Sequence, residues 1–372
     1  MSTPVPPLPK WADIVLLPLI NLAAAFVMCG LIVFAIGENP WEALKLMVQG
    51  ALGSTYGWGY TLYYATNFIF TGLAVAVAFH ASMFNIGGEG QAAMGGLGVA
   101  LAAFAFAWAP GILALPLAIV GAAILGGLWG VIPGYLQAKR GSHIVITTIM
   151  FNFIAASILV WLLGGPMMEA GQFSPQTGAL PEQTWLPKMA DMLGWIGIST
   201  AKSPLNASFL LALLAMLAFW VLIWRTRLGF AIRTVGQNPD AAHYAGINVA
   251  RTVIITMAIS GAFAGLLATN EIQGVSHKVI LNFSNGYGFT GIAVALMGRN
   301  HPIGIFLAAL LFGALVQGGG ELDFEFQTIT REMVLLIQGM IILFSGALAY
   351  MFNPPLARLI ARMAAGREVS HE

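Results

Sequence analysis

The chain has 372 residues, of which 58% are hydrophobic and only 8% are charged, with a formal net charge of +1. Soluble domains carry roughly 25% charged residues, so this composition excludes a water-soluble globular protein. The nearly neutral balance also gives no reason to expect a nucleic-acid partner, because such proteins carry a clear basic excess.

Apolar runs of ~20 residues recur along the chain, and a helix of that length crosses a hydrocarbon core of ~30 Å. The sequence therefore predicts an all-α integral membrane protein with about ten transmembrane helices. The expected spans are residues 13–36, 61–82, 92–109, 112–134, 144–164, 205–224, 252–270, 289–298, 302–319 and 333–352. The eighth span is too short to cross a membrane unless it begins within residues 279–288.

The segments between the spans differ in length and charge. We expect an interfacial helix and a loop at residues 37–60, the longest loop at residues 165–203 and an acidic loop at residues 321–332. Residues 1–12 form an N-terminal segment, residues 13–352 the transmembrane domain and residues 353–372 a basic tail.

Lysine and arginine are distributed unevenly between the two predicted sides. With ten spans, most of the 16 basic residues share the side of both termini: Lys10, Lys139, Arg140, Arg225, Arg227, Arg233, Arg251, Arg299, Arg358, Arg362 and Arg367. Basic residues accumulate in cytoplasmic loops. The sequence therefore predicts that both termini and residues 225–251 are cytoplasmic, and that residues 165–203 are extracytoplasmic.

Residues 225–251 form a long polar interruption that contains the signals of a short helix. Asn238 is a favourable N-cap, Pro239 suits the first helical position, and Asp240 favours the positive end of the helix dipole. Gly246 can close the helix in the left-handed conformation. We expect a helix of about two turns, which is either an ordinary connection or an element that docks in a groove on another protein.

A short echo connects two distant parts of the chain. TGLAVA at residues 71–76 resembles TGIAVA at residues 290–295, and each leads into a polar break that contains glycine. Membrane transporters are often built from repeated halves. In a chain rich in glycine and alanine, coincidence explains the match equally well.

Polar residues within or between the apolar spans are candidates for a translocation pathway. If residues 83–91 break inside the bilayer, Asn85 and Glu89 would face a cavity, with Gln91 beside them, because a charge buried in lipid costs several kcal/mol. Otherwise this stretch is a short cytoplasmic turn in which Glu89 is solvated or caps a helix. Asn67 and Asn152, inside spans, either line the pathway or form hydrogen bonds between helices.

The chain shows no sequence signature of an enzyme. Its six histidines lack the spacing of metal ligands, Cys29 is the single cysteine, and neither a nucleophile–base motif nor a phosphate-binding loop is present. We therefore expect no catalytic residue, no metal and no directly bound cofactor. Any work driven by ATP must come from another chain.

Three segments resemble a known family. GFAIRTVGQNPDAAHYAGI at residues 229–247 is similar to the coupling segment of ATP-binding cassette (ABC) importer permeases of the branched-chain amino acid and simple-sugar superfamily. FNIGGEGQ at residues 84–91, and AKRG with VITTIMFN at residues 138–141 and 145–152, resemble its nucleoside and simple-sugar branch. The remainder of the chain agrees in hydropathy only.

This resemblance implies a bacterial inner-membrane permease of the type II importer fold. Such permeases work in pairs, often of two different chains, with cytoplasmic ATPase subunits that bind ATP and an extracytoplasmic substrate-binding lipoprotein. The short helix would dock on the ATPase through residues that match the coupling segment: Arg233, Gly236, Asn238, Pro239, Asp240, His243, Tyr244 and Gly246. His243 departs from the family pattern, in which arginine is expected.

The expected function is import of a nucleoside or a simple sugar through a pathway in the membrane. Two alternatives remain from the sequence. A permease for branched-chain amino acids would share the architecture, whereas an ion-coupled secondary transporter would use Glu89 as the coupling carboxylate and need no ATPase.

Overall fold

The structure, a computed structural model, describes residues 9, 11–12, 16–326, 328–344 and 355–358. Across these residues the regular structure is helical apart from two isolated β-bridges, which confirms the all-α class. Seven of the described helices are long and apolar enough to cross a membrane: Leu17–Ala35, Thr55–His80, Gly111–Arg140, Ile144–Leu163, Ser208–Arg225, Val249–Ser276 and Pro302–Glu325. Ten crossings are therefore not established by helix length.

The chain divides into two compact units, residues 1–50 with 318–372 and residues 51–317. In the first unit, α1 (Leu17–Ala35) packs against α14 (Arg331–Ile342), and Cys29 Sγ lies 3.8 Å from the carbonyl oxygen of Ile337. This unit also contains most of α2 (Pro40–Leu52) and the end of α13 (Pro302–Glu325). Residues 321–325 and 331–332 are helical, so the prediction of a loop across 321–332 is wrong for its first five and its last two residues.

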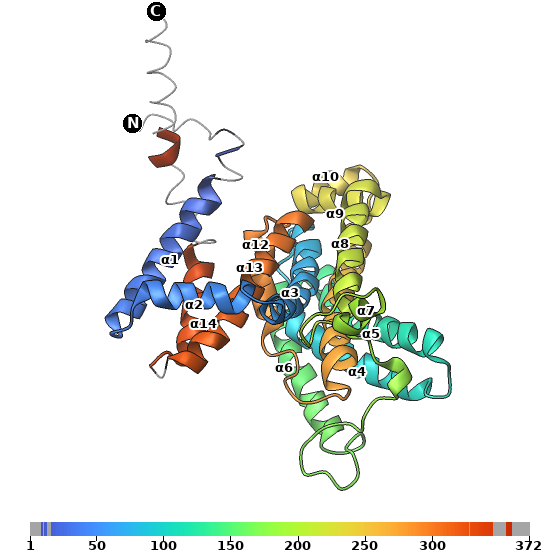
Figure 1. The fold of residues 1–372 in the computed structure, drawn as a ribbon. Coiled ribbons are helices and arrows are strands. Elements are labelled where there is room, and N and C mark those ends of the chain that lie inside the picture. The colour runs from blue at the N-terminus through green and yellow to red at the C-terminus, as the bar shows by residue number, and fades with distance from the viewer. Residues whose placement is uncertain (1–8, 10, 13–15, 327, 345–354, 359–372) are drawn as a thin grey trace, which may run out of the picture. The chain divides into compact units, whose positions relative to one another are not determined.

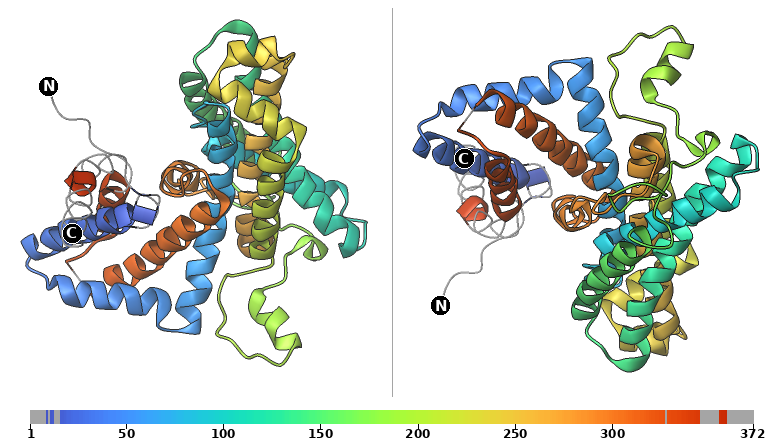
Figure 2. Two further views of the ribbon diagram at one scale, coloured as in Figure 1. Left: turned by 90° about the horizontal axis from the view of Figure 1, so that it is seen from above. Right: turned by 90° about the horizontal axis from the view of Figure 1, so that it is seen from below.

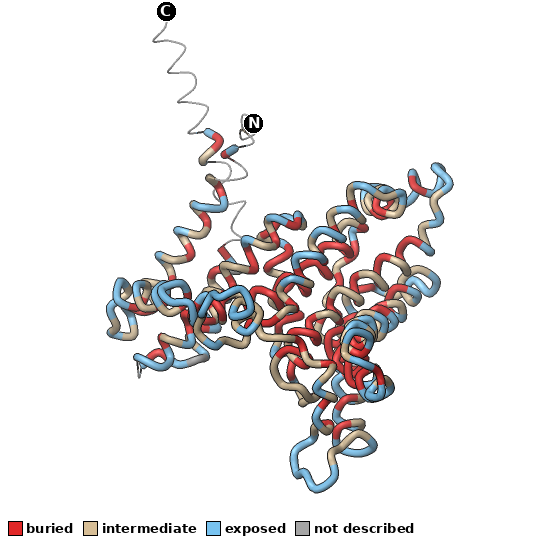
Figure 3. Tube along the Cα trace, turned by 45° about the vertical axis from the view of Figure 1, so that its right-hand side comes forward, coloured by how far each residue is buried: buried red, intermediate tan, exposed pale blue. Residues whose placement is uncertain are grey.

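Three helices form the tightest packing of the second unit: α4 (Gly88–Ala105), α5 (Gly111–Arg140) and α11 (Val249–Gly265). Their backbones meet at glycines, as they do where membrane helices associate through small residues. A Cβ at Gly95 would lie 2.5 Å from Gly265 Cα, and one at Gly126 would lie 2.5 Å from Gly261 O. Figure 3 shows the buried residues concentrated where the helices cross.

The two echo segments pack against each other. They lie in α3 (Thr55–His80) and α12 (Tyr287–Met297), where a Cβ at Gly72 would be 3.1 Å from Val294 Cγ1. After each segment the helix ends, and left-handed backbone follows at Ser82 (φ 52°) and at Asn300 (φ 54°). His80 Nε2 lies 3.2 Å from Asn300 O and connects the two breaks. The two similar sequence segments are therefore in contact, and a helix break follows each of them.

Several helices begin before or end after the predicted spans. α3 begins six residues early because Ser54 Oγ accepts from Gly57 N (3.0 Å) and caps it. α4 begins at Gly88 rather than residue 92, and α5 continues through Pro133 to Arg140. α12 begins at Tyr287 and has only eleven residues, so it is too short to cross a membrane by itself. The end of the predicted tenth span and most of both termini lie outside the described residues.

The second unit has two distinct ends. α8 (Ser208–Arg225), α9 (Arg227–Gln237) and α10 (Pro239–Tyr244) lead to one end, and the loop that follows α6 (Ile144–Leu163) lies at the other. That loop holds η2 (Glu182–Thr184) and α7 (Met189–Trp195) and contacts the π-helix η3 (Thr269–Ser276). Figure 2 shows these elements from above and from below.

Candidate functional site

The predicted short helix exists as α10, and its capping residues act as expected. Asn238 Oδ1 accepts hydrogen bonds from Asp240 N (2.9 Å) and Ala241 N (3.0 Å), and Pro239 occupies the first turn. Gly246 has φ +78°, and its N–H donates to His243 O (3.0 Å). The helix is closed at both ends by its own sequence, which makes it a preformed element.

One face of α10 is exposed. Ala242 is fully buried beneath the helix, whereas Asp240, His243 and Tyr244 are exposed, Tyr244 by 91%. Tyrosine is among the residues enriched at protein interfaces. Arg233 lies one helix earlier, half-buried in α9, with its Nε 3.4 Å from Gly229 O.

A direct backbone contact fastens α9 to the end of α3. A Cβ at Gly236 would overlap the carbonyl oxygen of His80, and Ser82 Oγ donates to Gly236 O (2.6 Å). Only glycine permits this approach. Because Gly236 lies two residues before the cap of α10, any displacement of α10 acts on the break between α3 and α4.

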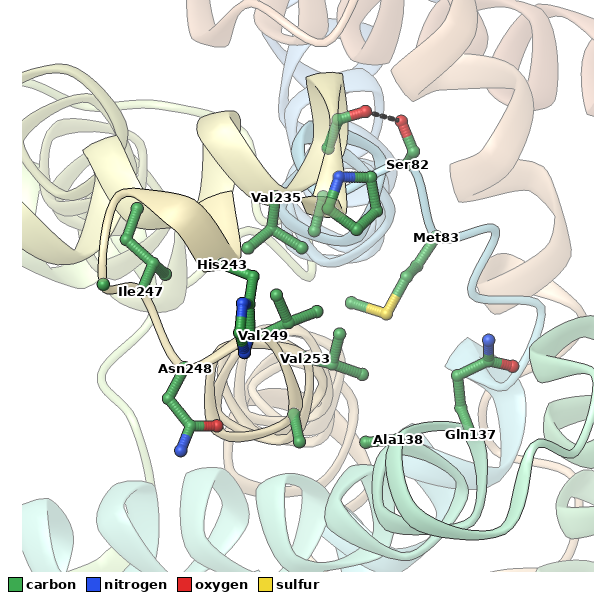
Figure 4. Close-up of a pocket in the computed structure, with 15 residues that line it drawn as sticks. Ser82, Met83, Gln137, Ala138, Val235, His243, Ile247, Asn248, Val249 and Val253 are labelled. Carbon is green, nitrogen blue, oxygen red and sulfur yellow. Dashed lines mark hydrogen bonds between the residues drawn. The ribbon is translucent and has the colours of Figure 1, made fainter. Parts of the chain in front are cut away.

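A cavity of about 820 Å³ lies behind α10 (Figure 4). It is lined by residues from four parts of the second unit: Ser82 and Met83 after α3, Gln137 and Ala138 at the end of α5, Val235, Gly236, Pro239 and His243 of α9 and α10, and Asn248, Val249 and Val253 at the start of α11. The helix is thus held at its ends and at Ala242 while space remains beside it.

Three of the predicted pathway residues brace the break between α3 and α4. Asn85, 1% exposed, donates to Gln91 Oε1 (2.9 Å) and Ser260 Oγ (2.8 Å) and accepts from Gly87 N (2.8 Å). Asn152 accepts from Gly90 N (2.8 Å) and donates to Ile86 O (2.9 Å). Each of these amides therefore satisfies neighbouring backbone or side-chain groups.

Glu89 also has specific partners in the protein. Its Oε1 accepts from Ser284 Oγ (2.7 Å) and Gly286 N (2.8 Å), and its Oε2 accepts from Gly288 N (2.8 Å). These donors belong to the N-terminus of α12, whose dipole favours a negative charge. The sequence left open whether Glu89 faces a cavity, is solvated or caps a helix. In the structure it caps a helix, α12, which is distant in the sequence.

Asn67 lies beside an acidic residue that sequence reasoning did not select. Asn67 Nδ2 and Tyr63 OH both donate to Glu271 Oε1, each at 2.6 Å. Glu271 lies on the π-helix η3, within the long apolar helix Val249–Ser276. Its position at the end of a predicted span resembled the start of a loop. The sequence signal that could have identified Glu271 is an isolated acidic residue beside the polar Asn270 and Gln273.

The opposite end of the unit is fixed by aromatic and polar contacts. Lys188 Nζ donates to Gly274 O (2.6 Å), and the rings of Trp185 and His277 stack with centroids 3.9 Å apart. Burial lowers the pKa of Lys188, and the nearby Asp191 opposes this. Burial also lowers the pKa of His277, and the charge of Lys188 adds to the effect. The loop after α6 is thus attached to the end of η3.

The comparisons with known proteins agree with this architecture. Residues 58–346 match the family model "Branched-chain amino acid transport system / permease component". The chain is 36% identical to the guanosine ABC transporter permease protein NupP of Bacillus subtilis (88% of this chain, 92% of the relative) and 36% identical to the nucleoside permease NupB of Lactococcus lactis (89% and 90%). It is 33% identical to the glucose ABC transporter permease protein TsgB13 of Haloferax volcanii (88% and 86%).

No solved structure matches the chain. The family match covers more than half of the chain, and the three relatives are permease components of ABC transporters. The chain therefore belongs to the family of branched-chain amino acid transport system permease components, and it is the transmembrane subunit of an ABC importer, in which a separate subunit hydrolyses ATP.

Proposed function

We propose that this permease imports a nucleoside or a simple sugar, and that a cytoplasmic ATPase drives it through α10. The observation that carries the proposal is the construction of α10. It is closed by Asn238 and Gly246, exposes Tyr244 by 91%, and is fastened through Gly236 to the end of α3. A rigid, exposed helix of this length suits a groove on a partner.

Movement of the ATPase would reach the membrane through two contacts. Displacement of α10 acts on α3 at the contact between Gly236 and His80, and on α11, which begins five residues after Tyr244. The cavity behind α10 provides the space for this displacement. Asp240 and Tyr244 would contact the ATPase directly, whereas His243, which lines the cavity behind α10, and the half-buried Arg233 of α9 would support the attachment.

The substrate proposal rests on the relatives. Two of them are named for guanosine or nucleosides and one for glucose. We place the nucleoside first because two relatives at 36% identity carry that description. Import of branched-chain amino acids, which the family description names, is the alternative within the same architecture.

We propose ten membrane-embedded helices, both termini in the cytoplasm and a location in the bacterial inner membrane. The seven long helices would be joined by α4, α12 and α14, which are apolar but shorter or less hydrophobic. The basic residues of the second unit support the orientation, since Arg225, Arg227 and Arg251 flank α10. Basic residues accumulate on the cytoplasmic side.

The remaining partners would be a second permease chain, which we expect to differ from this one, and an extracytoplasmic substrate-binding lipoprotein. The loop at residues 165–203 lies at the end of the unit opposite α10 and is fixed to η3 by Lys188. A binding protein that docks there would therefore influence the same helix that carries Glu271.

Substitution of Asp240 by arginine tests the proposal. The exposed carboxylate lies in the first turn of α10, where it favours the helix dipole and is available to the ATPase. In proteoliposomes that hold the complete transporter, Asp240→Arg should reduce substrate-stimulated ATP hydrolysis and uptake by about tenfold, as the loss of about 1.4 kcal/mol of docking energy would. Glu42→Arg, which changes an exposed carboxylate in the first turn of α2, is the matched control and should change neither.

The rival function gives a different result. An ion-coupled transporter would continue uptake when the ATPase is inactivated and would stop when the proton gradient is collapsed. That pattern, with normal uptake by Asp240→Arg, would exclude an ATP-driven permease.

A further inference from the structure

Glu271 carries a carboxylate within the long apolar helix Val249–Ser276. Both donors to Glu271, Tyr63 OH and Asn67 Nδ2, meet Oε1. Among the described residues, Oε2 has no hydrogen-bond partner and no cation forms an ion pair with Glu271. The side chain is half-buried rather than enclosed. An ionisable side chain inside a transmembrane segment indicates a functional site.

The depth of this carboxylate follows from its partner on α3. Asn67 is the thirteenth of the 26 residues of α3, about 18 Å from the start of the helix at 1.5 Å per residue. Glu271 itself lies on a π-helix, and π-helical turns occur frequently at functional sites. In transporters, substrates bind near the bilayer midplane where a helix is interrupted.

A chain of buried amides fixes the geometry around Glu271. Asn270, which is fully buried, donates to Asn67 Oδ1 (2.8 Å) and accepts from Asn206 Nδ2 (2.9 Å) and Ser208 Oγ (2.7 Å). Because Asn67 Oδ1 is occupied, its NH₂ group must face the carboxylate, which can only accept. Glu271 Oε1 is thereby held in place, and Oε2 is left as a preoriented acceptor.

A row of tyrosines leads along α3 to the same place. Tyr56, Tyr60 and Tyr64 are spaced by four residues and share one helix face, with ring centroids 4.7 Å and then 6.3 Å apart. The ring of Tyr64 lies 5.1 Å from that of Tyr63, which donates to Glu271, and 6.5 Å from that of Tyr287. Tyr60 and Tyr64 are half-buried, so part of each ring is accessible.

Anchoring at the membrane surface does not explain the whole row. Aromatic residues of the interfacial belt lie within the first turns of a span, and this explains Tyr56. Tyr64 is nine residues into α3, about 14 Å from its start, where a lipid-facing position would favour an aliphatic side chain. A hydroxyl-bearing ring at this depth is better suited to a polar pathway.

We propose that Tyr60, Tyr64 and Glu271 form a nucleoside-binding site within the translocation pathway. The base stacks on the tyrosine rings, and Glu271 Oε2 accepts a hydrogen bond from an N–H or O–H group of the nucleoside. Aromatic rings can stack on any nucleobase because every base has a π face. This site rests on the proposed function and narrows its substrate class, since a simple sugar lacks the flat base.

Equilibrium dialysis of guanosine against the purified transporter, without ATP, tests the site independently of coupling. Tyr64→Leu removes the ring and should weaken binding roughly tenfold, whereas Tyr64→Phe keeps the ring and should bind within about twofold of wild type. Glu271→Gln can still accept from Tyr63 and Asn67 through its amide oxygen, but it replaces the free acceptor with an NH₂ donor. It should also bind roughly tenfold more weakly.

Glu42→Gln, which changes an exposed carboxylate of α2, is the control and should leave binding unchanged. Equal binding by Tyr64→Leu and Tyr64→Phe, or by Glu271→Gln and wild type, overturns the site. ATP-dependent uptake of glucose by a wild-type complex that binds no guanosine also overturns it, while the proposed function stands. If uptake needs no ATPase, the proposed function is wrong. The dialysis measurements then still show whether Tyr64 and Glu271 bind guanosine.

Discussion

Gly236→Ala is expected to abolish the stimulation of ATP hydrolysis by substrate and its binding protein. The added methyl group would overlap the carbonyl oxygen of His80, which belongs to the backbone and cannot rotate away. Relief of the overlap requires α9 and α3 to separate, and it breaks the hydrogen bond from Ser82 to Gly236 O. We expect a loss of stimulation and of uptake of at least about tenfold, which corresponds to about 1.4 kcal/mol of coupling free energy.

Two further variants separate a coupling defect from misfolding. Ser82→Ala removes only the hydrogen bond and should reduce stimulation to a smaller extent with the same sign. Gly339→Ala, in α14 where the position is open, should behave as wild type. Elution of all variants at the wild-type volume in size-exclusion chromatography shows that they fold. Full stimulation of a well-folded Gly236→Ala transporter would contradict the role of this contact.

Gly126→Ala is expected to destabilise the membrane domain more than the same change at Gly127. A Cβ at residue 126 would lie 2.5 Å from Gly261 O and 2.8 Å from Gly265 Cα, so α5 and α11 would have to separate. At residue 127 the nearest atom, Ala258 O, is 3.0 Å away. Overpacking of a close contact costs roughly 1–3 kcal/mol, and here the neighbouring atoms are backbone on both sides.

The two variants differ by one position in the same helix and carry the same new side chain. Their thermal unfolding in detergent, followed by the loss of the monodisperse species, should therefore give a lower midpoint for Gly126→Ala than for Gly127→Ala. Equal midpoints would show that α5 and α11 do not pack at Gly126 as the structure describes.

The sequence predicts the local features of this protein well. Asn238, Pro239 and Gly246 specify α10 through capping rules that act within a few residues, and the structure confirms each of them. Hydropathy locates the apolar helices because burial in lipid depends on composition and length. Helix ends are less well predicted: Ser54 starts α3 early through a cap, and Gly318 to Gly320 do not end α13.

The polar sites depend on contacts that no local pattern contains. Glu89 caps α12 from a position almost 200 residues earlier in the chain, and only the fold shows that its partners are Ser284, Gly286 and Gly288. Glu271 appears in the sequence to begin a loop. It lies on a π-helix that extends a membrane span, and its carboxylate accepts a hydrogen bond from Asn67. The sequence marks Asn67 as a polar residue inside a span but does not show that Glu271 is its partner.

The side of the membrane on which α10 lies tests the account most directly. In a chain whose buried Cys29 is replaced by alanine, Tyr244→Cys introduces a single thiol at a position of α10 that is 91% exposed. A membrane-impermeant maleimide should label it in inside-out vesicles and not in right-side-out vesicles, and addition of the ATPase subunits should protect it. Labelling from the outer face, or labelling that the ATPase leaves unchanged, would contradict a permease driven through this helix.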